Sequence, residues 1–454
     1  MIPILILLSP LAGSLISLVL GRRPREICCI LSSFISLVLS TTALISVRAE
    51  PESFLSGEVI LDGLGALVAF LISLIVFLAS VYSPYYMNLD EKKHRTYYFL
   101  LQLFDFTMLS VCISNNIFLI WVFVEATTLS SVFLVALRGD PTSLEAGWKY
   151  VLLCTVGLSI ALFGTVMLYV NALEKIGESG ILWTELMRNK SVLDGRVLET
   201  AVIFLIAGYG VKAGLFPFHW WLPDAYSEAP TPVSSVLSGV LINCSFLAIA
   251  RFYLLSPSGI VSSLLMFFGI ISAIFGSIAM IRQVNMKRLL AYSSVENMGI
   301  ACIGLGAGGI GIMFSIFHVF NHGLLKSAAF LSWGGVERSN KMGGVPPSVA
   351  FSLVLSFILL GGCPPAGIFL SELGILTSVV RDVSVAVLYL ISTFVSFSVL
   401  SYSAMEKGLG KMLAEKSSFS AWIIPVISST ISIAAGLYPI PILHIIEEFL
   451  GGVG

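Results

Sequence analysis

Two apolar stretches of the chain are interrupted by glycine and proline, at Ala207-Gly-Tyr-Gly-Val-Lys-Ala-Gly-Leu-Phe-Pro217 and at Leu360-Gly-Gly-Cys-Pro-Pro-Ala-Gly367. Within a bilayer, such interruptions are tolerated where the freed backbone groups line a cavity inside the protein. Interrupted segments at corresponding positions of two structural repeats point to an ion or substrate site near the bilayer midplane. The alternative is a pair of proline kinks that only aid helix packing.

The composition predicts that the chain is an integral membrane protein. Of the 454 residues, 57% are hydrophobic and 11% are charged, and the mean hydropathy is +0.97. Soluble domains carry about 25% charged residues. The net charge of −1 and the lack of a basic patch exclude nucleic-acid binding. The apolar stretches are long rather than alternating, which predicts helices and not a β-barrel.

Hydropathy predicts an all-α integral membrane protein with about fourteen transmembrane helices. The predicted spans are 2–20, 27–47, 62–83, 96–113, 116–137, 148–170, 198–222, 231–254, 259–281, 290–308, 310–333, 348–376, 383–404 and 419–445. The two interruptions fall in the seventh and twelfth spans, and an odd offset makes these helices run in opposite directions. We therefore expect two inverted five-helix repeats with discontinuous helices 7 and 12. The predicted divisions are 1–95 (helices 1–3), 96–256 (helices 4–8), 257–405 (helices 9–13) and 406–454 (helix 14 and the C-terminus).

The connections between spans differ in their basic residues. Lys and Arg are more than twice as frequent after odd-numbered spans as after even-numbered ones, with Arg251 counted in the connection after the eighth span. Cytoplasmic connections carry the excess of Lys and Arg. We therefore expect a multi-pass protein of the cell membrane with both termini outside. The first span has no preceding positive residue and no cleavage site, which predicts a retained helix.

Ionisable residues inside the spans are the first functional candidates, because a charge at the bilayer centre costs roughly 2.5–3.5 kcal/mol. Glu125 lies in the middle of the fifth span, and Lys212 comes just before the interruption of the seventh. If the two side chains face each other, protonating the glutamate changes the proton affinity of the lysine. That arrangement would be a switchable proton site. A static ion pair is the alternative.

The eleventh span carries His318, His322 and Lys326 at a spacing of four, which puts them on one helix face over about 12 Å. Imidazoles titrate near neutral pH, so this face is typical of a proton relay. Glu372, after the interruption of the twelfth span, would end it. Packed core histidines and a metal site are the alternatives. No nearby cysteine or carboxylate completes a ligand set, and the seven cysteines form no CxxC pair, so we expect no metal in this chain.

Three long motifs carry a resemblance to a known family. They are Val211-Lys-Ala-Gly-Leu-Phe-Pro-Phe-His-Trp-Trp-Leu-Pro-Asp-Ala-Tyr-Ser-Glu-Ala-Pro-Thr-Pro-Val-Ser234, Lys287-Arg-Leu-Leu-Ala-Tyr-Ser-Ser-Val-Glu-Asn-Met-Gly299 and Phe317-His-Val-Phe-Asn-His-Gly-Leu-Leu-Lys326. Over nearly its whole length the chain resembles the antiporter-like proton-translocating subunits of respiratory complex I, membrane-bound hydrogenases and multisubunit sodium/proton antiporters. Glu145-Ala-Gly-Trp-Lys-Tyr-Val-Leu-Leu-Cys154 and Leu237-Ser-Gly-Val-Leu-Ile-Asn243 look most like the hydrogenase-4 component F branch.

The resemblance implies a role for each candidate residue. The family's glutamate of helix 5 falls on Glu125, its lysine of helix 7 on Lys212, and its terminal helix-12 residue on Glu372. Many members have a lysine in helix 8 where this chain has Asn243, and a histidine where it has Tyr226. The accessory positions are His219, Asp224, Glu228, Asn243, Glu296 and Lys149. Asp224 and Glu228 can equally be solvated loop carboxylates, and Glu296 and Asp105 can face a neighbouring subunit or cap a helix.

The function that the resemblance implies is that of a proton-translocating membrane subunit of a redox-driven ion pump, of a hydrogenase or complex I type. The redox chemistry would lie in other chains, with iron–sulfur clusters and nickel–iron in partner subunits and no cofactor in this one. Its partners would be homologous antiporter-like subunits, other membrane subunits, a peripheral redox arm and the lipid bilayer. Two alternatives stay open: a subunit of a sodium/proton antiporter without redox chemistry, and a structural membrane anchor with a vestigial proton path.

Overall fold

The computed structural model describes residues 2–46, 52–340, 344–408 and 418–453. The last residue of the predicted span 27–47 lies outside the described residues, as do 409–417 and 454 of the predicted C-terminal division.

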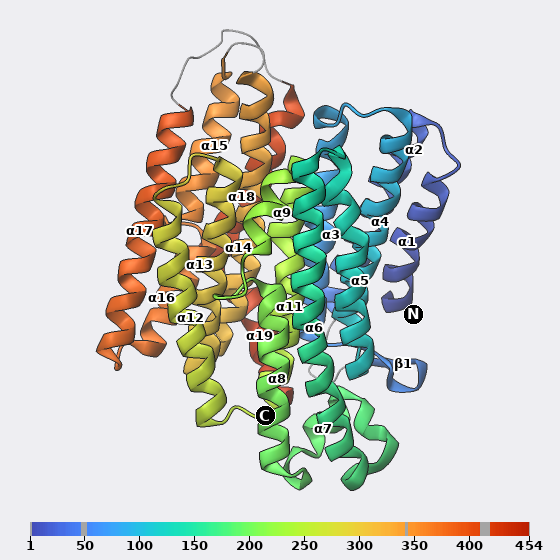
Figure 1. Ribbon diagram of the computed structural model, residues 1–454, viewed down its shortest axis with the longest axis vertical. Coiled ribbons are helices and arrows are strands. Elements are labelled where there is room, and N and C mark those ends of the chain that lie inside the picture. The colour runs from blue at the N-terminus through green and yellow to red at the C-terminus, as the bar shows by residue number, and fades with distance from the viewer. Residues whose placement is uncertain (1, 47–51, 341–343, 409–417, 454) are drawn as a thin grey trace.

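Helices make up nearly all of the described chain (Figure 1). In chain order they are α1 Ile2–Ser17, α2 Arg22–Ser46, α3 Gly63–Tyr86, α4 Glu91–Ile113, α5 Ile117–Val135, α6 Pro141–Ile176, α7 Trp183–Arg188, α8 Gly195–Ala213, α9 Trp221–Glu228, α10 Thr231–Val236, α11 Ile242–Leu255, α12 Gly259–Met280, α13 Met286–Ala307, α14 Ile310–Asn340, α15 Pro347–Leu360, α16 Gly367–Val379, α17 Val383–Gly408, α18 Phe419–Leu437 and α19 Ile440–Val453. A π-helical stretch, Leu237–Leu241, joins α10 to α11. The strands β1 (Glu52–Phe54) and β2 (Val59–Leu61) form an antiparallel hairpin.

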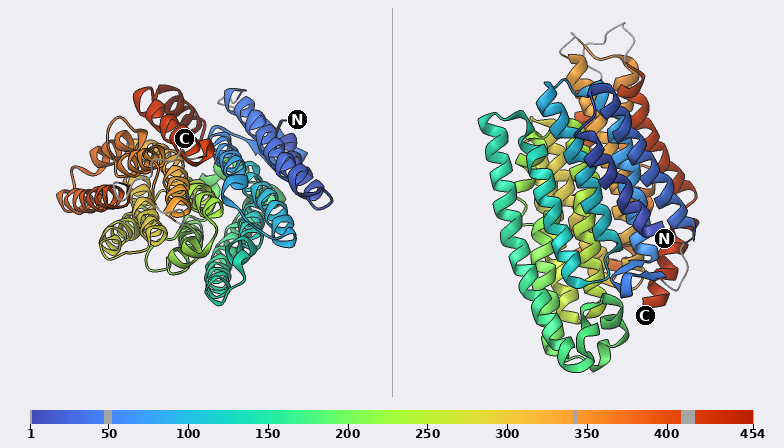
Figure 2. Two further views of the ribbon diagram at one scale, coloured as in Figure 1. Left: turned by 90° about the horizontal axis from the view of Figure 1, so that it is seen from above. Right: turned by 90° about the vertical axis from the view of Figure 1, so that its right-hand side faces the viewer.

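Most helices run along the long axis of the molecule, and short α7 lies at its lower end (Figures 1 and 2). Among the described residues, nine helices are long and apolar enough to span a bilayer, and α1, α15 and α16 are shorter apolar helices. The chain is therefore a multi-pass, all-α membrane protein, as its composition predicts.

Both predicted interruptions are confirmed. The seventh span ends as a helix at Ala213, where Gly214 adopts a φ of 78°, and helix resumes only at α9. The twelfth span divides into α15 and α16, with Gly362 at a φ of 87° between them. Glycine alone adopts positive φ without steric cost, so both helices stop at a glycine.

The count of fourteen spans and the division into inverted repeats stay predictions. The interrupted twelfth span contributes two helices of 14 and 13 residues, each too short to cross a bilayer of about 30 Å alone, so helix length does not decide the count. One boundary also differs from the prediction. The last predicted span, 419–445, is two helices, because α18 ends at Leu437 and α19 begins at Ile440, with Pro439 between them.

Polar N-caps set where several of these helices begin. The side chains of Asp90 and Asp140 accept hydrogen bonds from the first turns of α4 and α6, and Asn116 does the same for α5. A capping oxygen satisfies backbone N–H groups that have no partner within the helix. These residues therefore fix the ends of the helices that carry the candidate site.

Candidate functional site

Lys212 lies at the last turn of α8 and is completely buried. Its ammonium donates hydrogen bonds to Thr128 Oγ1 of α5 at 2.6 Å and to the Tyr150 hydroxyl of α6 at 2.8 Å. The Tyr150 hydroxyl also contacts Ser131 Oγ at 2.8 Å. Hydrogen-bonding partners offset the cost of burying a polar group, so two hydroxyl groups stabilise the ammonium inside the bundle and Ser131 contacts one of them.

Glu125 does not pair directly with Lys212. No ion pair joins them among the described residues, although the glutamate lies within electrostatic range of the lysine. Instead, Thr155 of α6 donates a hydrogen bond of 2.9 Å to Glu125 Oε1, while Oε2 is buried without a partner among the described residues. Glu125 is only partly buried, and large apolar side chains near it on α5 and α6 are exposed, including Val122 and Val156. The carboxylate is thus set between Lys212 and the outer face of the bundle.

Asn243 is the second residue of α11, which follows the π-helical stretch. Its Nδ2 donates to the Gly239 carbonyl at 2.8 Å and to the Val319 carbonyl of α14 at 3.2 Å, and its Oδ1 has no partner in the described chain. π-Helical turns inside α-helices are frequent at functional sites. Here the turn brings a polar side chain of α11 against the helix that carries the histidines.

His318, His322 and Lys326 share one face of α14, as their spacing predicts, and all three are completely buried. The imidazole rings of His318 and His322 are 6.3 Å apart. His318 Nδ1 contacts Ser371 Oγ of α16 at 3.0 Å. His318 Nε2 and both ring nitrogens of His322 have no hydrogen-bond partner among the described residues. Buried polar atoms without partners call for an explanation such as a bound water or an active role.

Lys326 and Glu296 form a second pair of opposite charges, and here both side chains are buried. Lys326 Nζ donates to the Leu290 carbonyl of α13 at 2.8 Å, and it interacts electrostatically with Glu296, which lies inside α13 and caps no helix. Glu296 Oε2 accepts hydrogen bonds from Asn297 and, at 3.3 Å, from Ser396 of α17. As with Lys212 and Glu125, the two charges are neighbours without direct contact in the described structure.

Glu372 lies at the second interruption and lines a cavity of about 390 Å³. Gly361, Gly362, Cys363 and Pro364 of the interruption form one wall, and α17 forms another. Ser371, the partner of His318, is the residue before Glu372 on α16, and neighbouring residues of a helix point in different directions. On α14 the order is Lys326, His322 and His318, and His318 contacts Ser371 of α16, the helix whose Glu372 lines the cavity.

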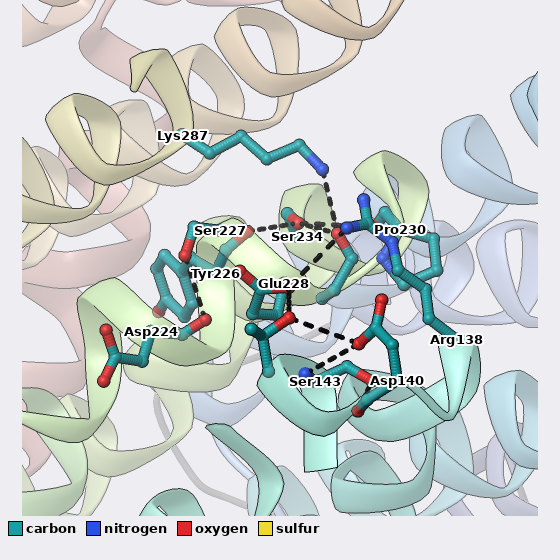
Figure 3. A network of polar contacts seen from close by, with 12 residues as sticks. Arg138, Asp140, Ser143, Asp224, Tyr226, Ser227, Glu228, Pro230, Ser234 and Lys287 are labelled. Carbon is teal, nitrogen blue, oxygen red and sulfur yellow. Dashed lines mark hydrogen bonds and ion pairs between the residues drawn. The ribbon is translucent and has the colours of Figure 1, made fainter. Parts of the chain in front are cut away.

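The accessory residues Asp224 and Glu228 belong to a polar network (Figure 3), and the accessory residue Lys149 pairs with Asp224. Asp224, on α9, pairs with Lys149 of α6 at 3.0 Å and with Arg288 of α13 at 2.6 Å. Glu228 accepts from Thr142 at 3.1 Å and lies 3.6 Å from Arg138. These carboxylates therefore belong to a helix and its ion pairs rather than to an open loop.

The network extends to both sides of the turn between α9 and α10. Lys287 of α13 donates to the Ala229 carbonyl at 2.9 Å (Figure 3). On the other side, hydrogen bonds from Ser143 lower the pKa of Asp140, the N-cap of α6, below its usual value. The network thus holds α6, α9 and α13 together near the first interruption.

The remaining accessory residue, His219, and Tyr226, which stands where many family members have a histidine, are both buried near the first interruption. His219 packs against the rings of Phe216, Trp220 and Phe275, and neither of its nitrogens has a partner among the described residues. Tyr226 donates to the Leu237 carbonyl at 3.0 Å, at the first residue of the π-helical stretch.

Comparison with known proteins shows the family of the chain. The family described as NADH:quinone oxidoreductase/Mrp antiporter, transmembrane, matches residues 114–401. The chain belongs to this family. A hydrogenase-4 component F homolog of Methylacidiphilum infernorum (isolate V4) is 34% identical over 444 residues, which is 92% of each chain. NADH-quinone oxidoreductase subunit N of Desulforudis audaxviator (strain MP104C) is 29% identical over 401 residues, 82% of this chain and 79% of the relative.

A solved structure extends the family likeness to the fold. The membrane-bound sulfane sulfur reductase, an archaeal respiratory membrane complex, contains a chain that superposes with a TM-score of 0.88. The superposition covers 99% of this chain and 97% of the other at 22% identity. At that identity the likeness establishes the fold of the family and not a residue's role.

The sequence analysis missed a buried ion pair of α11 and the hydrogen-bond partners of Lys212. Arg251, counted above as a loop residue, lies inside α11, where it is buried and pairs with Asp62 at 2.9 Å. Thr128 and Tyr150 were not predicted as partners of Lys212. A hydroxyl in an apolar helix is common, and nothing local to it reveals which distant side chain it contacts.

Proposed function

We propose that this chain is an antiporter-like membrane subunit that translocates protons for a multisubunit redox complex of the hydrogenase type. The observation that carries the proposal is the set of buried or cavity-lining ionisable side chains on α8, α14 and α16, from Lys212 to Glu372, which we take as one line between the two interrupted helices. Such groups are expensive inside a membrane and mark proton relays. The 34% identity to a hydrogenase-4 component F homolog over 92% of both chains supports the type of complex.

In the proposed cycle, Lys212 accepts a proton from the cytoplasmic side while Glu125 sets its affinity. The hydroxyls of Thr128 and Tyr150 solvate the charged ammonium and remain as partners when the proton leaves. Glu125 would receive the redox energy as a change in electric field, because it lies between Lys212 and an exposed apolar face where a neighbouring subunit can pack. A change of charge near Glu125 then alters how strongly Lys212 holds its proton.

The second half of the path moves the proton to the outside. Neutral imidazoles with unpartnered nitrogens, as on His318 and His322, can accept a proton on one nitrogen and release it from the other. Water bridges the gaps, including the one beside Asn243, where many members have a lysine. Glu372 then releases the proton into its cavity, and Lys326 with Glu296 repeats the arrangement of Lys212 with Glu125.

The redox chemistry of the proposed complex belongs to partner subunits, with iron–sulfur clusters and nickel–iron in a peripheral arm. Gentle detergent extraction from the native membrane, with identification of every co-purifying chain and assays for iron and nickel, tests this assembly. Iron–sulfur and nickel subunits are expected. Partners without these metals would favour a sodium/proton antiporter, and the family description names an antiporter beside the oxidoreductase. A chain that purifies alone would contradict both.

Proton movement is tested in inverted membrane vesicles with hydrogen or NADH as reductant. Lys212→Met keeps the length of the side chain and removes its charge, so proton uptake should be lost while the complex still assembles. Lys175→Met, on the exposed end of α6, is the matched control and should pump normally. Normal pumping by the Lys212 variant would contradict the proposal and leave a structural anchor. Proton movement that needs added sodium and no reductant would favour the antiporter.

A further inference from the structure

A second set of buried polar residues lies on α4, apart from the line between Lys212 and Glu372. His94, Tyr98, Gln102 and Asp105 follow one another at spacings of four, four and three, so they share one face of the helix. We call these four residues the polar file. It runs about 16 Å along the helix axis, from the end of the bundle into its interior. All four side chains are at most 1% exposed.

The outer end of the polar file is an ion cluster at the surface. Arg25 of α2 donates to His94 Nδ1 at 2.8 Å, and His94 Nε2 contacts Glu26 Oε1 at 2.9 Å. Because an arginine only donates, Nδ1 accepts and Nε2 carries the hydrogen, which makes His94 neutral in this arrangement. Arg25 also pairs with the exposed Glu91 at 2.8 Å. The cluster therefore connects a buried imidazole to partly exposed carboxylates.

The middle of the polar file runs past Cys29 of α2. The Tyr98 ring lies 4.8 Å from that of His94, and its hydroxyl has no partner among the described residues. Gln102 donates to Ser33 Oγ at 2.8 Å and to Cys29 Sγ at 3.0 Å, while its Oε1 is unpartnered in the described chain. Cys29 interacts electrostatically with both Tyr98 and Asp105. Polar atoms with free hydrogen-bonding capacity thus recur from His94 to Asp105.

The inner end is Asp105, a fully buried carboxyl neither of whose oxygens has a hydrogen-bond partner among the described residues. The titratable groups that interact with it are the thiols of Cys29 on α2, Cys112 on α4 and Cys244 on α11. No ion pair to Asp105 occurs in the described chain, and it neither caps a helix nor faces outward. Burying a carboxylate with no protein donor or cation beside it is costly, so a carboxyl in this position binds a proton instead.

We propose that Asp105 is a proton-binding carboxyl that is loaded from the His94 end of α4 along the polar file. It is a site apart from the line between Lys212 and Glu372. The nearest connection to that line is Cys244, which interacts electrostatically with both Asp105 and Lys212. The unpartnered oxygens of Asp105, the spacing of the polar file and the surface cluster together support a site with access from one end.

Infrared spectroscopy of the intact purified complex tests the bound proton. Subtracting the spectrum of the Asp105→Asn complex from that of the wild type should leave one carboxylic-acid C=O band, which shifts in D₂O. Asp105→Glu should restore a band at a shifted position. Asp194→Asn, at the exposed N-cap of α8, is the matched control and should leave no such band, because asparagine caps as well as aspartate. Identical carboxylic-acid regions in wild type and Asp105→Asn would overturn the proposal.

The access route is tested by the rate at which that band exchanges in D₂O. Gln102→Leu removes one polar position and should slow exchange about tenfold, equivalent to roughly 1.4 kcal/mol on the barrier. Thr107→Val is the control, because Thr107 lies on the same helix and contacts Ser130 of α5 instead. Unchanged exchange in Gln102→Leu, or equal slowing in Thr107→Val, would refute the route. The band should persist in the Lys212→Met complex, which separates this proposal from the one above.

Discussion

The helical interruption between α8 and α9 borders an apolar cavity, whereas the interruption between α15 and α16 borders a cavity lined by a carboxylate. The first cavity, of about 260 Å³, is lined only by apolar side chains and glycine, including Leu215 and Phe216 of the interruption. The second, of about 390 Å³, includes Glu372. Both interruptions turn at a glycine of positive φ, Gly214 in one and Gly362 in the other.

The difference shows that an interrupted helix does not by itself create a route for an ion. Lys212 does not line the cavity beside its interruption, and its ammonium points instead to Thr128 and Tyr150 inside the bundle. Glu372 lines its cavity directly. The first ionisable group is therefore sealed and the second is open, which gives the proposed path a closed end and a release end.

The largest expected effect comes from removing the carboxylate of the open end. Glu372→Gln should reduce redox-driven proton uptake about 100-fold or more, the lower range for losing a positioned acid–base group. Assembly should not change, because the side chain borders a cavity rather than a packed core. Glu447→Gln, on the exposed face of α19, is the control. Proton uptake in vesicles measures both, and normal uptake in the Glu372 variant would remove the distinction between the two ends.

The sealed end should depend more on its hydrogen bonds than the open end does. Tyr150→Phe removes one of the two partners of a buried ammonium, which should cost about 1–3 kcal/mol of stability. Ser371→Ala removes the partner of His318 beside the open cavity, and a neutral hydrogen bond contributes only about 0.5–1.5 kcal/mol. Thermal unfolding of the purified complexes compares the two variants. A larger loss for Ser371→Ala would reverse the assignment of sealed and open ends.

Substitutions of Gly214 and Gly362 separate the effect of backbone strain on stability from the effect of the cavity-lining carboxylate on proton uptake. Gly214→Ala and Gly362→Ala should each cost about 1–2 kcal/mol, because alanine is strained at positive φ. A Cβ at 214 would meet Leu222, while a Cβ at 362 would meet the Glu372 carboxylate. We therefore expect both variants to unfold at lower temperature and only Gly362→Ala to change proton uptake per electron. Equal uptake in the two variants would indicate that Glu372 does not act at this cavity.

The sequence predicted both helix interruptions but not the contacts around them. Glycine and proline inside apolar stretches are visible locally, so both interruptions were found, and the spacing of four put His318, His322 and Lys326 on one face. Contacts across the fold carry no such local signal. The partners of Lys212 lie 84 and 62 residues away in the chain, and Asp62 lies 189 residues from Arg251. The sequence left open whether Lys212 faces Glu125, and in the structure the ammonium donates to two hydroxyl groups instead.

The smallest expected effect is a difference in the rate of thiol labelling, which tests whether water reaches each of the two cavities. Cys363 borders the open cavity and is partly exposed, so a charged, membrane-impermeant thiol reagent should modify it. Phe218 borders the apolar cavity and is 44% exposed. A cysteine placed there by Phe218→Cys, in a protein without Cys363, should nevertheless react at least about tenfold more slowly than Cys363. The reason is that a thiol needs water to form the reactive thiolate. Replacing the partly exposed Cys28 by serine in both proteins removes the competing thiol. Equal rates would mean that water reaches both interruptions, and the sealed end would then have to be sought elsewhere along the path.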